Sequence, residues 1–436
     1  MTAHFVRATA ETVFGPVATV PIMPIGERGL SEFASLFHAQ PVCFNVKGQM
    51  TVSVVVNTDL TESVAAGCQL GDGICRKGRK EPPDAVIVFA SPIYDYVALL
   101  TAISNACRPK TLVGCSSAGE FLTGRISSSS ACAVAIWSKE IKFSVGLGKG
   151  LRTSPAAAAK QIVSSFRRTG TSSHHLSALV LTDALAGHTE EFLEQLTLAT
   201  AGRYQLFGGG AGDDARFQRT HVFCGVEAIT DAAVALEMVS EKPFGIGFHH
   251  GWTPASDPLR VTEADGVRLI SLNAAPAVEA FQEFAESTRQ HFNMDDPMPF
   301  FLQNIIGIDT PAGYKLRVPL CANADGSIDC AAEVPTGSTV CLMKATSASA
   351  ADAAADATQS ALSKLDGVEA SVALFFDCAA TRLRLGDNFR TEVDRVQKIL
   401  GPTPLAGCNT YGQIARTEGQ FTAFHNCTAV VCIVPQ

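Results

Sequence analysis

Apolar residues in this chain gather in short runs that are separated by amphipathic stretches. Four runs have the length of one buried strand: "DAVIVFA" (84–90), "ACAVAIW" (131–137), "ASVALFF" (370–376) and "CTAVVCIV" (427–434). Apolar residues at helical spacing follow the first run at 94–107 and the third run at 388–400. Strands that alternate with helices of this length indicate an α/β fold.

The chain also repeats itself. "GCSSAGEF" (114–121) aligns without gaps on "GCNTYGQI" (407–414), and each copy follows the same strand–helix–strand pattern. A weaker copy has a strand at 177–183, a helix at 189–200 and then "LFGGGAGDD" (206–214). Self-similarity of this length indicates duplicated structural units. We therefore expect strand–helix–strand units that end in glycine turns, where α/β folds usually bind ligands.

Further helices are predicted outside the repeats. Ser154 and Pro155 provide a cap and a first-turn proline for a helix at 156–167. A helix at 274–292 is followed by "DDPMPF", and the alanine-rich segment before Gly367 forms another capped helix. The first 50 residues carry little periodicity and are interpreted as an N-terminal extension.

Composition narrows the classes of function. Hydrophobic residues make up 47% of the chain, charged residues 17%, and the formal net charge is −8. A negative chain without a long basic run is unsuited to nucleic acid or to an anionic membrane surface. No apolar stretch approaches the ~20 residues of a membrane-spanning helix. Fourteen cysteines include no Cys-x-x-Cys, and several lie inside apolar runs, so we expect a soluble cytoplasmic protein with reduced thiols.

These motifs together resemble the FIST family. "DAVIVFASPIYD", "VGCSSAGEF", "LFGGGAGDD" and "GIGFHHGW" follow the order of its N-terminal domain, and "VALFFDC", "LAGCNTYGQI" and "FHNCTAVV" that of its C-terminal domain. The resemblance implies two mixed-sheet FIST halves, an N-terminal domain at 51–273 and a C-terminal domain at 274–436, after an extension at 1–50. One departure is "FFDCAATR" (375–382), where relatives more often have Cys-Ala-Gly-Arg.

The family resemblance implies a function in signalling. It suggests a cytoplasmic, non-enzymatic sensor that binds a small ligand and acts on a separate output partner. One branch, the NosP proteins, binds haem b, senses nitric oxide and regulates a histidine kinase. Haem b is therefore a candidate cofactor and a histidine kinase a candidate partner.

The glycine turns allow two interpretations. They are either tight packing turns or a ligand site with backbone N–H donors and a few polar side chains. On the second interpretation the turns come together around one cavity. The candidate ligand contacts are Cys115, Ser116, Ser117, Glu120, Gly208, Gly209, Gly210, Asp213, Asn409, Tyr411, Gly412 and Gln413.

Two further chemistries remain open. Cys115 or Cys408 is a candidate nucleophile for a cysteine-dependent enzyme, although the glycine spacing differs from a nucleophile elbow and no histidine base is adjacent. Haem requires an axial ligand, commonly histidine. His188, in a strand-to-helix loop, is the first candidate and His250 the second.

Overall fold

The computed structural model describes residues 50–167, 174–417, 419–420 and 423–436. Apart from Met50, the predicted N-terminal extension lies outside these residues. The described chain is α/β, as predicted, and contains three six-stranded sheets of identical plan and a fourth, nine-stranded sheet.

Each of the three related sheets has a central pair of parallel strands. The pairs are β2 (Ala85–Ala90) with β3 (Leu112–Ser116), β8 (His175–Thr182) with β9 (Gln205–Gly210), and β23 (Ala370–Cys378) with β24 (Leu405–Thr410). Each pair continues the strand–helix–strand repeat of the sequence. A later strand of the same unit (β6, β12 or β27) pairs antiparallel with the first member, and an outer strand (β1, β7 or β13) completes that side. The repeat therefore occurs three times in the fold.

The strands of the three sheets, in order across each sheet, are as follows. The first contains β1 (Thr51–Thr58), β6 (Ala131–Ser138), β2 (Ala85–Ala90), β3 (Leu112–Ser116), β10 (Val222–Cys224) and β11 (Glu227–Ile229). The second contains β7 (Lys142–Lys149), β12 (Ala232–Ser240), β8 (His175–Thr182), β9 (Gln205–Gly210), β25 (Gln413–Arg416) and β26 (Phe424–His425). The third contains β13 (Gly245–His249), β27 (Ala429–Pro435), β23 (Ala370–Cys378), β24 (Leu405–Thr410), β4 (Glu120–Leu122) and β5 (Arg125–Ser127).

The last two strands of each sheet come from a different unit. Hairpin β4–β5 follows β3 in sequence but pairs with β24, hairpin β25–β26 follows β24 but pairs with β9, and hairpin β10–β11 follows β9 but pairs with β3. The three units thus exchange hairpins in a ring. Each sheet is complete only when two units are folded.

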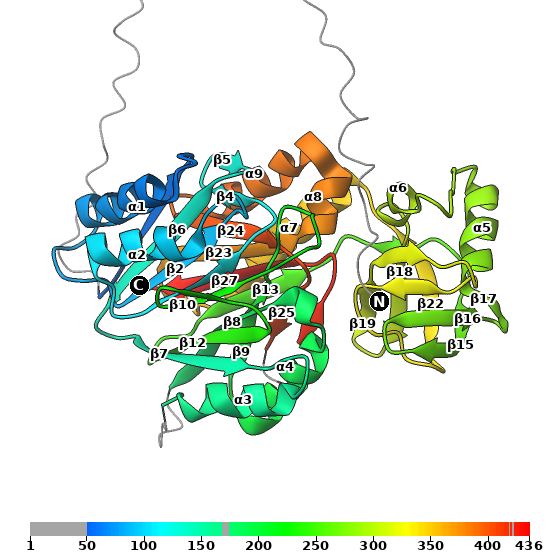
Figure 1. Cartoon of the computed structure of the whole chain (residues 1–436), viewed down its shortest axis with the longest axis horizontal. Coiled ribbons are helices and arrows are strands. Elements are labelled where there is room, and N and C mark those ends of the chain that lie inside the picture. The colour runs from blue at the N-terminus through cyan, green and yellow to red at the C-terminus, as the bar shows by residue number, and fades with distance from the viewer. Residues whose placement is uncertain (1–49, 168–173, 418, 421–422) are drawn as a thin grey trace, which may run out of the picture. The chain divides into compact units, whose positions relative to one another are not determined.

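Two helices pack against each sheet (Figure 1). They are α1 (Ser63–Lys77) and α2 (Tyr96–Cys107), α3 (Pro155–Ser164) and α4 (Thr189–Ala199), and α7 (Ser347–Ser363) and α9 (Phe389–Leu400). The predicted cap of α3 is confirmed, since the Ser154 side chain accepts a hydrogen bond from the Ala157 backbone N–H and Pro155 begins the helix. Two other helices also start after capping residues: Asp95 accepts a hydrogen bond from the Ala98 backbone N–H, and Thr346 forms a capping box with Ser349.

The opposite faces of the three sheets share one core. Along β2, for example, Ile87 and Phe89 face this shared core, whereas Val86 and Val88 face α1 and α2. Because both faces are covered, the strand is a continuous apolar run rather than an alternating one. At the centre the ring of Phe376 lies 5.6 Å from that of Phe89 and 6.3 Å from that of Phe207, so all three units meet there.

The fourth sheet is an insertion between β13 and α7 of the third unit; in Figure 1 it is the yellow-green part that carries α5 and α6. The boundary at 273/274 falls inside it, between β16 and β17. Its strands and helices are β14 (Thr253–Pro254), β15 (Leu259–Asp265), β16 (Arg268–Leu272), β17 (Ala275–Pro276), α5 (Ala277–Thr288), α6 (Met298–Phe301), β18 (Ile305–Thr310), β19 (Gly313–Arg317), β20 (Pro319–Ala322), β21 (Ile328–Cys330) and β22 (Thr339–Lys344).

Candidate functional site

The three glycine turns converge, as the repeats predict. They meet through direct backbone hydrogen bonds because glycines let the chains approach closely. Three bonds join the turns in a ring: Gly212 N–H to Ser116 O at 2.9 Å, Ala118 N–H to Asn409 O at 3.0 Å, and Tyr411 N–H to Gly210 O at 2.9 Å. We call this arrangement the turn junction.

Polar candidates in the turn junction are buried and hydrogen-bonded within the protein. The hydroxyls of Ser117 and Ser130 both donate to the Glu120 carboxyl group. Burial raises the pKa of Glu120 to about 7, although these two hydrogen bonds oppose the shift. The Asn409 side-chain oxygen accepts from Arg382 at 3.0 Å. Arg382 also donates to the Ser127 carbonyl oxygen at 3.0 Å, and this bond joins the third unit to the first.

Asp213 organises the loop that follows the second turn. Its carboxylate accepts hydrogen bonds from the backbone N–H groups of Phe217, Gln218 and Arg219 at 2.7–2.9 Å. The Tyr411 hydroxyl also donates to Asp213. The rings of Tyr411 and Phe217 stack with centroids 4.6 Å apart at 11°. Tyr411 therefore contacts the 213–217 loop in two ways: its hydroxyl is hydrogen-bonded to Asp213, and its ring stacks on Phe217.

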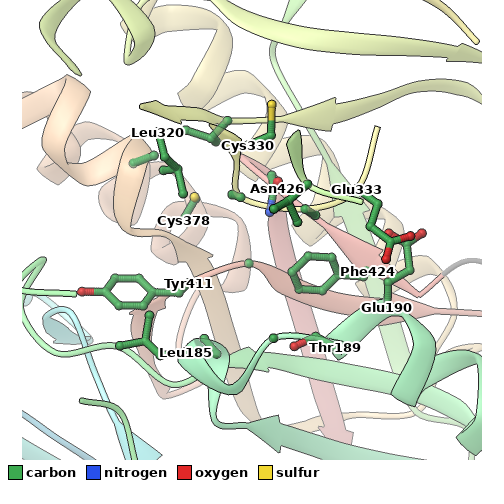
Figure 2. A pocket seen from close by; sticks show the side chains of 18 of the residues that line it. Leu185, Thr189, Glu190, Leu320, Cys330, Glu333, Cys378, Tyr411, Phe424 and Asn426 are labelled. Atoms are coloured by element: carbon green, nitrogen blue, oxygen red, sulfur yellow. The ribbon is translucent and has the colours of Figure 1, made fainter. Parts of the chain in front are cut away.

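A cavity of about 540 Å³ adjoins the junction, and Figure 2 shows its lining. Its walls come from the second unit, the third unit and the inserted sheet. Of the candidate residues, Tyr411, Gly412 and His188 line it. The other candidate ligand contacts lie in the shared core or in the turn junction beside it: Cys115 in the core, and Ser116, Ser117, Glu120, Gly208, Gly209, Gly210, Asp213, Asn409 and Gln413 in the junction.

The cavity has mainly apolar walls and several carboxylates. Apolar lining residues include Leu185, Val267, Met298, Leu302, Val318, Leu320, Leu383 and Phe424. Acidic lining residues are Glu190, Glu191, Asp265 and Glu333, and no described lining residue is lysine or arginine. The volume lies within the range of small-ligand pockets.

A buried ion-pair network holds the acidic end of the cavity. The Arg317 guanidinium donates to the Glu190 carboxylate at 2.8 Å and to the Glu333 carbonyl at 2.7 Å. Lys315 also pairs with Glu190. The side chains of Glu190 and Glu333 lie at the same end of the cavity in Figure 2. Glu190 is thus neutralised by protein cations, and Arg317 also interacts electrostatically with Glu333, whose carboxylate lies at the rim.

Comparison with known families identifies the chain. The model of the FIST N domain matches residues 84–275, and the model of the FIST C domain matches residues 259–416. The chain belongs to the FIST family. FIST domains are small-ligand-sensing domains of signalling proteins. The cavity is lined by residues from both matched domains, and the 273/274 boundary falls where the two matches overlap.

Solved structures are only distantly similar to this FIST protein. The structure titled "Cyanuric acid hydrolase: evolutionary innovation by structural concatenation" is 13% identical, covering 88% of this chain and 100% of that chain, with a TM-score of 0.30. Cyanuric acid hydrolase from A. caulinodans is 9% identical, with 89% and 99% coverage and a TM-score of 0.29. PurLQS from Thermotoga maritima is 8% identical, with 88% and 72% coverage and a TM-score of 0.21. No curated protein matches the chain.

The two candidate histidines of this FIST protein differ in whether the imidazole faces the cavity, where it could bind a ligand. His188 lines the cavity at the start of α4, with its Nδ1 3.4 Å from the Glu191 carboxylate. His250 is not among the residues that line this cavity, and both its ring nitrogens are engaged, with Tyr314 O at 3.1 Å and the Trp252 N–H at 3.4 Å. Burial lowers the pKa of His250. Of the two, only His188 faces the cavity.

The candidate nucleophiles lie in the shared core. Cys115 and Cys408 are fully buried among apolar side chains, and burial raises the pKa of Cys408 well above its ordinary value. A buried thiol of this kind is a poor nucleophile. This environment matches the packing role that the repeated turn suggests.

Two other cysteines line the FIST cavity, and they differ from each other. Burial raises the pKa of Cys330 to about 12. Cys378 lies at the end of β23, where its Sγ accepts a hydrogen bond from the Cys427 thiol at 4.0 Å. That bond, together with backbone N–H groups, outweighs burial and lowers the pKa of Cys378 to about 6.

The sequence gives few signals for the cavity walls. The departure at "FFDCAATR" lies at Cys378, but no motif distinguishes Leu185, Glu190 or Phe424. These residues are distant in sequence and meet only because the inserted sheet packs beside the second and third units.

Among the described residues, no helix is long and apolar enough to cross a membrane.

Proposed function

We propose that this FIST protein is a non-enzymatic cytoplasmic sensor of a small molecule that combines an apolar body with a cationic group. The supporting observation is the cavity of about 540 Å³, which both family domains line. A ligand there would contact the second unit, the third unit and the insertion together. Binding would therefore favour one arrangement of these parts over another.

The ligand class follows from the lining. Apolar walls favour an apolar body, and burying it would supply most of the affinity. Carboxylates of Asp265 and Glu333 at the cavity attract a cation, and no lining lysine or arginine is present among the described residues to attract an anion. An alkyl or aryl ammonium ion has both properties.

Tyr411 connects the ligand cavity to an exposed loop, so that ligand binding changes the protein surface. Its ring lines the cavity and stacks on Phe217, whose side chain is 48% exposed. Its hydroxyl bonds Asp213, which holds the 217–219 backbone. A ligand that displaces the Tyr411 ring would shift this loop, which is a surface where a separate output partner would bind.

The proposal of a non-enzymatic, cytoplasmic protein is supported by the thiols. Cys115 and Cys408 are fully buried and do not line the cavity. The described cysteines are free, which favours a reducing compartment.

Haem b with a histidine-kinase partner is the alternative that the NosP branch suggests. His188 would supply an axial imidazole at the cavity. Haem b also carries two propionates, and the described lining offers carboxylates but no lysine or arginine to pair with them. The residues present therefore do not fit haem b well. A Soret band that appears with added haem and is lost in His188→Ala would reverse this assignment.

Thermal unfolding with matched probes tests the ligand class. We expect octylamine to raise the Tm of the full chain, and octanoate and octanol at equal concentration to raise it less. Glu333→Gln should weaken the amine's affinity by about tenfold, the size of one lost charge-assisted contact. The exposed Glu283 on α5 does not line the cavity, so Glu283→Gln is the matched control. Stabilisation by octanoate alone would contradict the proposal.

A further inference from the structure

Cys378 and Cys427 form a pair of thiols at the cavity wall. Their sulfur atoms are 4.0 Å apart, and both are free. Cys378 is 4% exposed and is one of the residues that line the cavity. Cys427 lies behind it, next to the lining residue Asn426.

The arrangement of donors assigns different roles to the two sulfurs. The Cys427 S–H donates to Cys378, which places the proton on Cys427 and negative charge on Cys378. The pKa of Cys427 is correspondingly raised, first by this hydrogen bond and then by burial. A thiolate is the nucleophilic form of cysteine. Cys378 is thus the attacking sulfur, and Cys427 is the resolving thiol.

The backbone at Cys427 is also unusual. Its φ of 48° lies in the left-handed region, which non-glycine residues seldom adopt. Such conformations persist where the surrounding structure enforces them, often at functional sites. Here the conformation accompanies a sulfur that is directed at Cys378.

We infer that Cys378 and Cys427 are a redox-active pair that is oxidised to a disulfide by a hydroperoxide entering the cavity. The Cys378 thiolate attacks the terminal peroxide oxygen, an S–O bond forms, the O–O bond breaks, and the alcohol leaves after taking a proton. The Cys427 sulfur then attacks the Cys378 sulfenic acid. The S–S bond forms, the S–O bond breaks, and water leaves with the Cys427 proton.

This reaction balances without another reductant. Two thiols lose two electrons, and one hydroperoxide becomes one alcohol and one water. The apolar walls favour an organic hydroperoxide over hydrogen peroxide. The inference goes beyond the proposed function, since it holds whether or not the cavity binds a cationic ligand.

Peptide mapping of the intact chain tests the inference. Reduced protein is treated with one equivalent of cumene hydroperoxide or of hydrogen peroxide, and remaining thiols are then blocked with N-ethylmaleimide. We expect a cross-linked peptide containing Cys378 and Cys427, formed faster with cumene hydroperoxide. Faster formation with hydrogen peroxide would assign the pair to the smaller oxidant and overturn the preference for an organic one.

Variants separate the two sulfurs. In Cys427→Ser, Cys378 should stop at sulfenic acid, which dimedone traps, and the cross-link should be absent. Cys321→Ser is the matched control, because Cys321 is a free cysteine of the inserted sheet that does not line the cavity and whose sulfur contacts only oxygen atoms, and it should behave as the wild type.

Labelling of the wild type gives a result that does not depend on the folding of any variant. In unoxidised protein, N-ethylmaleimide should label Cys378 at least about tenfold faster than Cys330, because its thiolate fraction is higher. Equal labelling rates would overturn the inference. So would oxidation confined to the exposed Cys68 and Cys75, with Cys378 and Cys427 recovered as free thiols.

Discussion

At the scale of single residues, the turn junction keeps a carboxyl group away from water. Glu120 is fully buried between the hydroxyls of Ser117 and Ser130. Burial raises its pKa from 4.5 to about 7, so the folded protein holds this proton more tightly than the unfolded chain does. The contribution to stability is therefore complete below pH ~4.5 and is lost as the pH rises through ~7.

Glu120→Gln should remove this pH dependence, because the amide is neutral at every pH and keeps one acceptor oxygen. Between pH 5 and pH 8 the wild type should lose about 2 kcal/mol of unfolding free energy that the variant retains. Urea unfolding of both proteins at the two pH values measures the difference. Parallel pH profiles would mean that Glu120 is already ionised in the folded protein at pH 5.

At the scale of elements, glycine determines how closely strands and turns approach. In β3, β9 and β24 the equivalent glycines Gly114, Gly208 and Gly407 lie opposite the preceding parallel strand, and an added Cβ would lie 1.9–2.1 Å from a carbonyl oxygen. A ring of the exchanged hairpin also lies close to two of these positions, Phe223 at 3.0 Å from the added Cβ of Gly114 and Phe121 at 2.4 Å from that of Gly407. The glycine in each repeat thus lets the parallel strands approach, and in the first and third sheets it also makes room for a ring from another unit.

The turn between β24 and β25 allows a controlled test of this packing. Gly412 has a φ of 84°, and an added Cβ would lie 2.3 Å from the Phe424 ring. Gly124 has a φ of 71° with open space around it. We expect Gly124→Ala to cost about 1–2 kcal/mol from its backbone conformation. Gly412→Ala should cost about 1–3 kcal/mol more because the ring must move. Equal losses of unfolding free energy in the two variants would show that the Phe424 ring moves aside without any loss of stability.

At the scale of the whole molecule, the hairpin exchange makes the three units depend on one another. Phe121 belongs to the first unit in sequence but packs against Phe375 and Phe389 in the third. Each of the three six-stranded sheets takes its last two strands from another unit, so no unit completes its sheet alone. The units should therefore unfold together.

Phe121→Ala tests this dependence. Trp137 reports on the first unit, and the other tryptophan, Trp252, is replaced by phenylalanine in both proteins. Removal of the ring should cost about 3–5 kcal/mol. The urea midpoint seen by Trp137 fluorescence should fall together with that seen by far-UV circular dichroism. An unchanged Trp137 midpoint would show that the first unit unfolds independently of the third.

The sequence by itself determined the elements and the repeat. Buried strands such as β2 are visible as apolar runs, and the start of α3 is visible in Ser154 and Pro155, because both depend on neighbouring residues along the chain. The convergence of the glycine turns could also be predicted from the sequence, since duplicated units pack with equivalent ends together. Of the candidate ligand contacts in those turns, only Tyr411 and Gly412 line the cavity, because the turns pack directly on one another.

Only the tertiary structure decided which strands share a sheet and where the cavity lies. Hairpin β4–β5 pairs with β24, almost 300 residues away, and nothing local distinguishes that partner from β3. The cavity likewise joins Glu190, Cys330 and Cys378, whose neighbours in sequence give no common pattern. Local preference specifies an element, whereas the partner of that element depends on the packing of distant surfaces, which appears only when the chain is folded.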